Sequence, residues 1–116
     1  MCDELIKIKE RLRKFVSDRD WDKYHTPKNL AAALVVEAGE LLEHFQWLSE
    51  EESKNLDSDK IEKVSEEIAD VFIYLILLSD KLGLDIFEVT NRKIDINEKK
   101  YPAEKVRGSS RKYNEY

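Results

Sequence analysis

The sequence predicts an all-α protein, a four-helix bundle that assembles into an oligomer, and three observations predict it. Apolar residues recur at helical spacing along most of the 116 residues. Glycine and proline are scarce, at 3 and 2 residues, which excludes most turn-rich all-β architectures. Residues 71–78 are apolar all round, so one chain of four helices cannot cover them. We therefore expect a homo-oligomer, a tetramer or dimer of dimers.

The first half of the chain predicts two helices. The first is expected over residues 3–17, because Leu5, Ile8 and Leu12 fall on one face. Residues 18–26 form a polar connection. Thr26 and Pro27 then start a second helix, since threonine caps helix N-termini and proline suits the first helical position. This helix is expected to run to about residue 48.

The second half predicts two more helices, after a charged loop over residues 49–58. Asp59 with Glu62 resembles a capping box, and the helix it starts is expected to end at Gly83. Asp85 with Glu88 starts a fourth helix, which ends before Pro102. Residues 1–102 thus form the predicted helical domain, and residues 103–116 form a basic C-terminal tail.

Charge and hydropathy limit the classes of partner. The net charge of −5 argues against nucleic acid. Residues 92–113 hold eight basic and three acidic residues, which leaves the rest of the chain at −10. A chain with separate basic and acidic regions suits a ligand that combines a metal ion with phosphates. The single cysteine excludes an internal disulfide framework.

Membrane and export signals are not apparent in the sequence. The longest apolar run, residues 71–78, is too short to span a bilayer, and the first residues lack the apolar stretch of a signal peptide. We therefore expect a cytoplasmic protein with no membrane partner.

Two carboxylate pairs stand on the apolar faces of the second and third helices. Glu37 and Glu40 are three residues apart, as are Glu67 and Asp70, so each pair shares one helix face. Buried carboxylates are unfavourable unless they are protonated or bind a cation. Mg²⁺ and Mn²⁺ prefer oxygen ligands, so the spacing favours a divalent metal site. The alternative is a network of ion pairs with Lys60, Lys63 and Lys81.

A di-iron centre is a second alternative, because four-helix bundles also build such centres from carboxylates. Those centres use a Glu-x-x-His pair on two helices. In this chain His44 follows Glu40 at the fourth position instead, and the sequence has only 2 histidines. The sequence therefore disfavours iron.

The order of these carboxylates resembles the all-α nucleoside triphosphate pyrophosphohydrolases of the MazG/dUTPase superfamily. The flanking segments are similar to its dCTP pyrophosphatase branch, and the resemblance covers residues 12–113. The segments that carry it are residues 19–25, 27–30, 45–47, 70–75, 93–97, 100–102, 107–109 and 112–113. One departure is Leu12, at a position where the branch carries a histidine.

The resemblance implies Mg²⁺-dependent hydrolysis of a (d)NTP, dCTP or a modified dCTP, to the monophosphate and pyrophosphate. Such a reaction cleanses the nucleotide pool. The resemblance implies that all four carboxylates bind Mg²⁺ (or Mn²⁺), and it assigns activation of water to Glu37 or Glu40. The alternative function is a non-catalytic nucleotide-binding, sensing or assembly module. The complete carboxylate set favours the enzyme, because a degenerate binder would be expected to lose a ligand.

The resemblance also implies substrate-binding residues. Trp21 and Trp47 would stack on the base, beside Tyr74, while His25 and Asn29 would hydrogen-bond the base edge or sugar. Trp47 has an alternative interpretation as a core residue at a helix end, and Tyr74 as a core residue.

Phosphate contacts are expected from the basic segment. Lys93, Asn97 and Lys100 share one face of the fourth helix, and the tail residues Arg107, Ser109, Arg111 and Lys112 would close over the ligand, from the same or a neighbouring subunit. The alternative is a disordered basic end.

Overall fold

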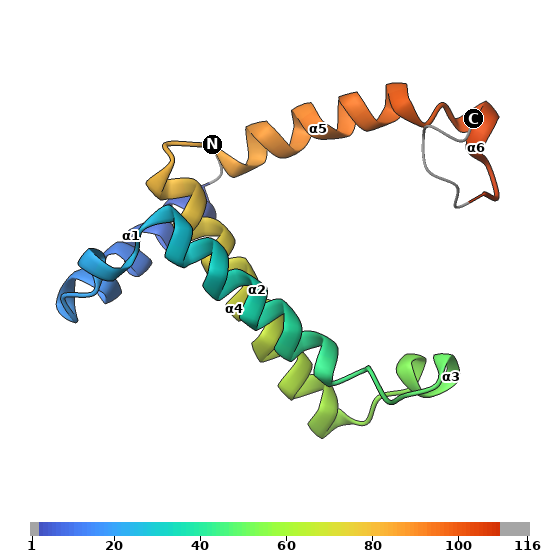
Figure 1. Cartoon of the computed structure of the whole chain (residues 1–116), viewed down its shortest axis with the longest axis horizontal. Coiled ribbons are helices and arrows are strands. Elements are labelled where there is room, and N and C mark those ends of the chain that lie inside the picture. Colours follow the sequence, from blue (N-terminus) through green and yellow to red (C-terminus); the bar gives the residue numbers. More distant parts are fainter. Residues whose placement is uncertain (1–2, 110–116) are drawn as a thin grey trace. The chain divides into compact units, whose positions relative to one another are not determined.

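The computed structural model describes residues 3–109, and every regular element in that range is a helix (Figure 1). The predicted all-α class is confirmed. No helix in this part of the chain is long and apolar enough to cross a membrane. The elements are α1 (Asp3–Asp18), the 3₁₀ turn η1 (Asp22–Tyr24), α2 (Pro27–Glu43), α3 (Glu50–Lys54), α4 (Ser58–Lys81), α5 (Ile86–Lys100) and α6 (Ala103–Val106).

The chain consists of two compact units, residues 1–83 and residues 84–116. The first holds α1 to α4, and the second holds α5 and α6. The domain boundary predicted after residue 102 stays a prediction. Of the tail residues named above, Arg111 and Lys112 lie outside the described residues.

Helix α4 is the central element of the first unit. Helix α2 packs along it, as Figure 1 shows, and α1 also contacts it. The core is small and consists of side chains from these three helices that are 1–7% exposed: Leu5, Val16, Leu30, Val64 and Ile76. Each contributes about 1.5–3 kcal/mol by leaving water. Packing against α4 therefore places the facing side chains of α2 and α1.

The start of α2 is as predicted. The Thr26 hydroxyl accepts a hydrogen bond from the backbone N–H of Asn29 at 3.2 Å, with Pro27 in the first helical position. The predicted end near residue 48 is wrong, because α2 ends at Glu43. The N–H groups of His44 and Phe45 bond to carbonyls three residues back, which tightens the chain into turns.

The connection between α2 and α4 differs from the predicted loop. Ser49 and Glu52 form a capping box that starts the short helix α3. Asp57 caps α4 by accepting from the N–H of Lys60 at 2.8 Å, so the predicted Asp59–Glu62 capping box is wrong. Gly83, which has a positive φ of 69°, follows the end of α4, as predicted.

The second unit begins with a helix start that the sequence predicted correctly. The carboxylate of Asp85 accepts hydrogen bonds from the N–H groups of Phe87 and Glu88, at 3.0 and 3.2 Å. Helix α5 ends at Lys100, before Pro102 as expected, and the four-residue helix α6 follows.

Candidate active site

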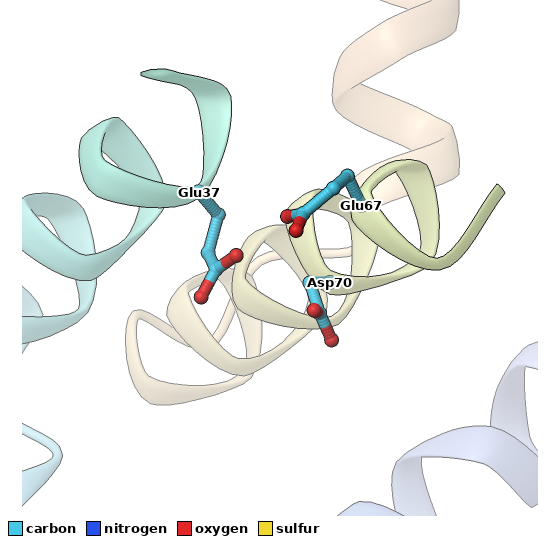
Figure 2. A group of neighbouring side chains, drawn as sticks. All are labelled: Glu37, Glu67 and Asp70. Atoms are coloured by element: carbon cyan, nitrogen blue, oxygen red, sulfur yellow. The ribbon is translucent and has the colours of Figure 1, made fainter. Parts of the chain in front are cut away.

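Three carboxylates from two helices converge in the first unit. Glu37 of α2 and Glu67 and Asp70 of α4 each offer an oxygen, and these oxygens all lie within 4.8 Å of one another. Figure 2 shows Glu37 extending from α2 toward the two residues on α4. Oxygens gathered this closely would suit a hard divalent cation such as Mg²⁺.

Two oxygens of this cluster are buried without a partner. The Oε2 atoms of Glu37 and Glu67 have no hydrogen-bond partner among the described residues. Burial, followed by the nearby carboxyl groups of Glu67 and Glu40, raises the pKa of Glu37 to about 7. Such groups are unfavourable without compensation, and a cation would supply it. An all-oxygen donor set fits Mg²⁺ or Mn²⁺.

Glu40 adjoins this cluster but is not one of the three residues whose oxygens converge. Its carboxylate is near enough to contribute to the raised pKa of Glu37 and to that of Tyr74. The four predicted ligands therefore share one neighbourhood, in which three are at ligand distance from one another.

Two of the three lysines that could have neutralised the cluster bind other carboxylates. The Nζ of Lys63 lies 3.4 Å from Asp59, and the Nζ of Lys81 lies 2.6 Å from Asp22. Two of the three lysines in the ion-pair alternative are thus engaged elsewhere, which favours the metal interpretation.

A cavity of about 570 Å³ borders the carboxylates. Glu37 and Asp70 line it together with Trp21, His25 and Tyr74. The rest of the lining is mostly apolar and comes from α1 and α4: Ile8, Arg11, Leu12, Phe15, Val16, Ala69, Phe72, Ile73, Ile76 and Leu77. A cavity of this size with a few convergent polar groups is typical of a small-molecule site.

Three of the five residues predicted to contact the base or sugar line this cavity, namely Trp21, His25 and Tyr74. The ring of Trp21 meets Phe15 edge-on, with centroids 5.7 Å apart, which sets its orientation. Burial raises the pKa of the Tyr74 hydroxyl, and the charges of Glu37, Asp70 and Glu40 raise it further. The structure thus places aromatic surface and carboxylates around one space.

Trp47 and Asn29 lie elsewhere. Trp47 is 86% exposed in the segment after α2, so its alternative interpretation as a core residue is wrong for this chain alone. Its stacking on a base stays a prediction. The side-chain amide of Asn29 donates to the backbone carbonyl of Tyr24 at 2.9 Å. Its hydrogen bond to a nucleotide also stays a prediction.

The predicted phosphate-binding residues belong to the second unit. Lys93, Asn97 and Lys100 all lie on α5, at positions that share a helix face, and Arg107 follows α6. Their part in binding stays a prediction.

Sequence reasoning missed one charged residue of the cavity. Arg11 lines its wall, although the pattern of α1 gave no functional signal for it. Arg11 follows Ile8 by three residues and precedes Phe15 by four, and both of these line the cavity, so helical spacing could have placed Arg11 on the same face.

Comparison with known proteins identifies the class. The MazG-like family matches residues 32–116, so this chain belongs to that family. Human dCTP pyrophosphatase 1 is 42% identical over 113 residues, which are 96% of this chain and 66% of the human protein. The mouse protein of the same name is 39% identical, and the match again covers 96% of this chain and 66% of the relative. The chain thus spans 66% of the length of these two relatives.

A solved structure supports the same fold. The crystal structure of a pyrophosphatase from Archaeoglobus fulgidus matches with a TM-score of 0.78 and 42% identity. The match covers 88% of this chain and 95% of the archaeal one.

Proposed function

We propose that this chain hydrolyses dCTP or a modified dCTP between the α- and β-phosphates, which yields the monophosphate and pyrophosphate. The observation that carries the proposal is the convergence of Glu37, Glu67 and Asp70 beside a cavity that Trp21 and His25 also line. The names of the human and mouse relatives support the reaction and the base, and that of the archaeal structure supports the release of pyrophosphate. The reaction removes surplus or damaged nucleotides from the cytoplasmic pool.

The carboxylates would hold Mg²⁺ (or Mn²⁺), with Glu40 beside the three that converge. When bound, the ion neutralises triphosphate charge and polarises the α-phosphorus. Glu37 or Glu40 accepts a proton from the attacking water. The oxygen of that water bonds to the α-phosphorus, and the bond from this phosphorus to the bridging oxygen of the leaving pyrophosphate breaks.

The cavity accounts for recognition of the base. Trp21 offers a face for stacking, which contributes about 1–3 kcal/mol per base in nucleic-acid systems. His25 donates to the base edge or sugar, and Tyr74 adds aromatic surface. Asn29 and Trp47, which do not line the cavity, are proposed to contact the nucleotide in the same two ways. Lys93, Asn97, Lys100 and Arg107 bind the phosphates. Leu12 lines the cavity and replaces the branch's histidine, so it bears on the preferred base.

The working form in this proposal is a homo-oligomer, a tetramer or dimer of dimers. The small core of the chain supports it, and so do large apolar side chains exposed on two helices. Val35 and Val36 of α2 are 70% and 59% exposed, and Ile68 of α4 is 54% exposed. A second copy would remove these side chains from water.

A product assay tests the proposed reaction. The protein is incubated with Mg²⁺ and a panel of canonical and modified NTPs and dNTPs, and pyrophosphate is separated from orthophosphate. The expected result is pyrophosphate with a monophosphate, fastest from dCTP-like substrates. Orthophosphate would contradict the reaction. Mg²⁺-dependent nucleotide binding without turnover would instead indicate a sensing module.

A further inference from the structure

The turn formed by residues 20–25 carries two cavity residues, Trp21 and His25, on a segment outside the long helices. We propose that Asp22 and Lys81 are positioning residues, whose ion pair holds this turn so that Trp21 and His25 are set for nucleotide binding. The inference rests on the proposed function and adds to it residues that do not line the cavity beside the carboxylates.

The first end of the turn is fixed by the way α1 terminates. The N–H of Trp21 bonds to the carbonyl of Val16 at 3.0 Å, and that of Asp20 to Ser17 at 3.1 Å, the pattern of a Schellman motif. Asp20 takes a left-handed φ of 53°, uncommon for a residue other than glycine. The motif turns Trp21 back onto Phe15, where their rings meet.

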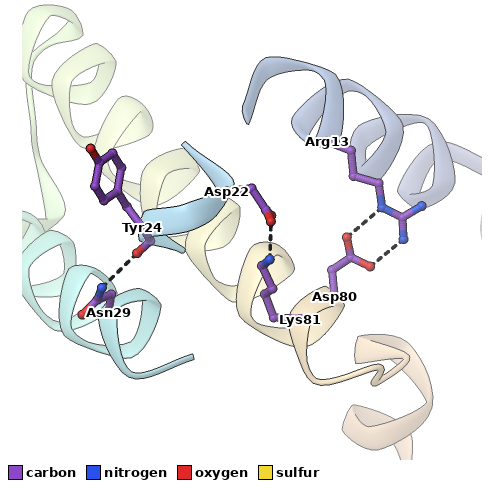
Figure 3. A network of polar contacts seen from close by, with 6 residues as sticks. All are labelled: Arg13, Asp22, Tyr24, Asn29, Asp80 and Lys81. Atoms are coloured by element: carbon purple, nitrogen blue, oxygen red, sulfur yellow. Dashed lines mark hydrogen bonds and ion pairs between the residues drawn. The ribbon is translucent and has the colours of Figure 1, made fainter. Parts of the chain in front are cut away.

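The second end of the turn is held by α2. The side-chain amide of Asn29 donates to the carbonyl of Tyr24, as Figure 3 shows, at 2.9 Å. Thr26 caps the same helix end through the Asn29 N–H. The last residues of the turn are therefore tied to the first turn of a helix that packs along α4.

The middle of the turn is tied to α4 itself. The Nζ of Lys81 contacts the Oδ1 of Asp22 at 2.6 Å, across 59 residues of sequence (Figure 3). Helix α4 carries Glu67, Asp70 and Tyr74. The Asp22–Lys81 pair thus links the wall that holds Trp21 and His25 to the helix that holds the carboxylates.

The pair is exposed enough that it should affect the turn more than the fold. The Asp22 side chain is 73% exposed and that of Lys81 34% exposed. Exposed pairs add little to global stability, so the variants should stay folded. Loss of the pair frees the turn, and nucleotide must then order it on binding. We expect KM to rise about twofold to fivefold with kcat little changed, in line with the strength of exposed pairs.

Opposite charges make the kinetic test specific. Lys81→Met removes a positive charge and Asp22→Asn a negative one. If the pair positions the turn, both variants should raise KM. The charge-swapped double variant, Asp22→Lys with Lys81→Asp, should then bring KM partly back to the wild-type value. Direct attraction of Lys81 to the triphosphate predicts that Asp22→Asn lowers KM, which would overturn the proposal. Lys63→Met is the control, because it breaks the Lys63–Asp59 pair on the same helix.

A fluorescence measurement tests the turn without catalysis. In a Trp47→Phe background, Trp21 is the one remaining tryptophan of the 2 in the sequence. Lys81→Met should increase the quenching of Trp21 by acrylamide, and Lys63→Met should not. Unchanged quenching, or increased quenching with unchanged KM, would overturn the proposal. Turnover of dCTP by the wild-type protein tests the proposed function separately.

Discussion

Among the clustered carboxylates, Glu37 has the pKa that burial and its neighbours raise, to about 7. Its Oε2 is buried without a partner among the described residues, and three further carboxylates surround it. The spacing of Glu37, Glu40, Glu67 and Asp70 predicted this cluster from sequence, because residues three apart on a helix share a face. The sequence did not predict the link between Asp22 and Lys81, since no local periodicity relates residues 59 positions apart.

The variant Glu37→Gln tests whether Glu37 is a metal ligand or a structural residue. Without a divalent ion the variant should be at least as stable as the wild type, because one repelling charge is gone. Addition of Mg²⁺ should raise its Tm less than that of the wild type, and turnover should fall about 100-fold. Thermal unfolding with and without Mg²⁺ measures both effects on stability, and Glu43→Gln at the exposed end of α2 is the control. Equal stabilisation of Glu37→Gln and the wild type by Mg²⁺ would exclude Glu37 as a ligand.

At the scale of elements, side-chain caps set the helix starts, and the sequence predicted them where a cap stood beside clear apolar periodicity. Thr26 and Asp85 cap α2 and α5 as expected. The charged segment before α4 offers both Asp57 and Asp59 as caps, and the structure uses Asp57. Helix α3 was missed because five polar or charged residues give no periodic signal, although its Ser49–Glu52 capping box is visible in the sequence.

The ion pair between Arg13 of α1 and Asp80 of α4 makes a pH-dependent contribution to the free energy of unfolding. Arg13 donates two hydrogen bonds to Asp80, at 2.8 and 2.6 Å, and these hold the pKa of Asp80 below its ordinary value of 3.8. The positive charges of Lys9 and Lys81 act in the same direction, and burial opposes them. A carboxyl group whose pKa is lower in the folded protein than in the unfolded chain stabilises the fold at pH values above its unfolded pKa. This contribution is lost as the pH falls through the folded pKa.

Asp80→Asn should therefore reduce the free energy of unfolding by about 1 kcal/mol at pH 7, the upper range for a partly exposed pair. The difference from the wild type should begin to shrink below about pH 3.8, as Asp80 of the unfolded chain becomes protonated, and should be lost below the lowered pKa of Asp80 in the folded protein. Urea unfolding at pH 7 and pH 3 measures both values. Asp18→Asn, which breaks the exposed Lys14–Asp18 pair within α1, should have a smaller effect. An equal loss at both pH values would contradict this explanation.

For the whole molecule, the sequence predicted the all-α class from apolar residues at helical spacing with few glycines and prolines, and it predicted a second copy from the all-round apolar segment over residues 71–78. The all-α class is confirmed. Within α4, residues such as Phe72 remain 40% exposed although the segment is apolar all round. The proposed phosphate contacts of Lys93 and Lys100 come from the family resemblance, because periodicity places residues on a helix face but does not place that helix.

Assembly should depend on the exposed apolar face of α2. Val35→Glu puts a charge where a valine is 70% exposed, so it should shift the oligomer toward smaller species by making contact with a second copy unfavourable. Light scattering coupled to size-exclusion chromatography measures the mass. Lys28→Glu, which makes a charge change at another exposed position of α2, should leave the mass unchanged. A wild-type mass of 13.7 kDa would show a monomer and contradict the proposed assembly.

In the proposed reaction, water beside the carboxylate cluster attacks the α-phosphorus of a dCTP-like nucleotide. The first experiment is hydrolysis of dCTP by the wild-type protein in ¹⁸O-labelled water with Mg²⁺, followed by mass spectrometry of both products. We expect one ¹⁸O atom in the monophosphate and none in pyrophosphate. Label in pyrophosphate would place the attack on the β-phosphorus, and label in orthophosphate would show release of the terminal phosphate. Either result would contradict the proposed reaction.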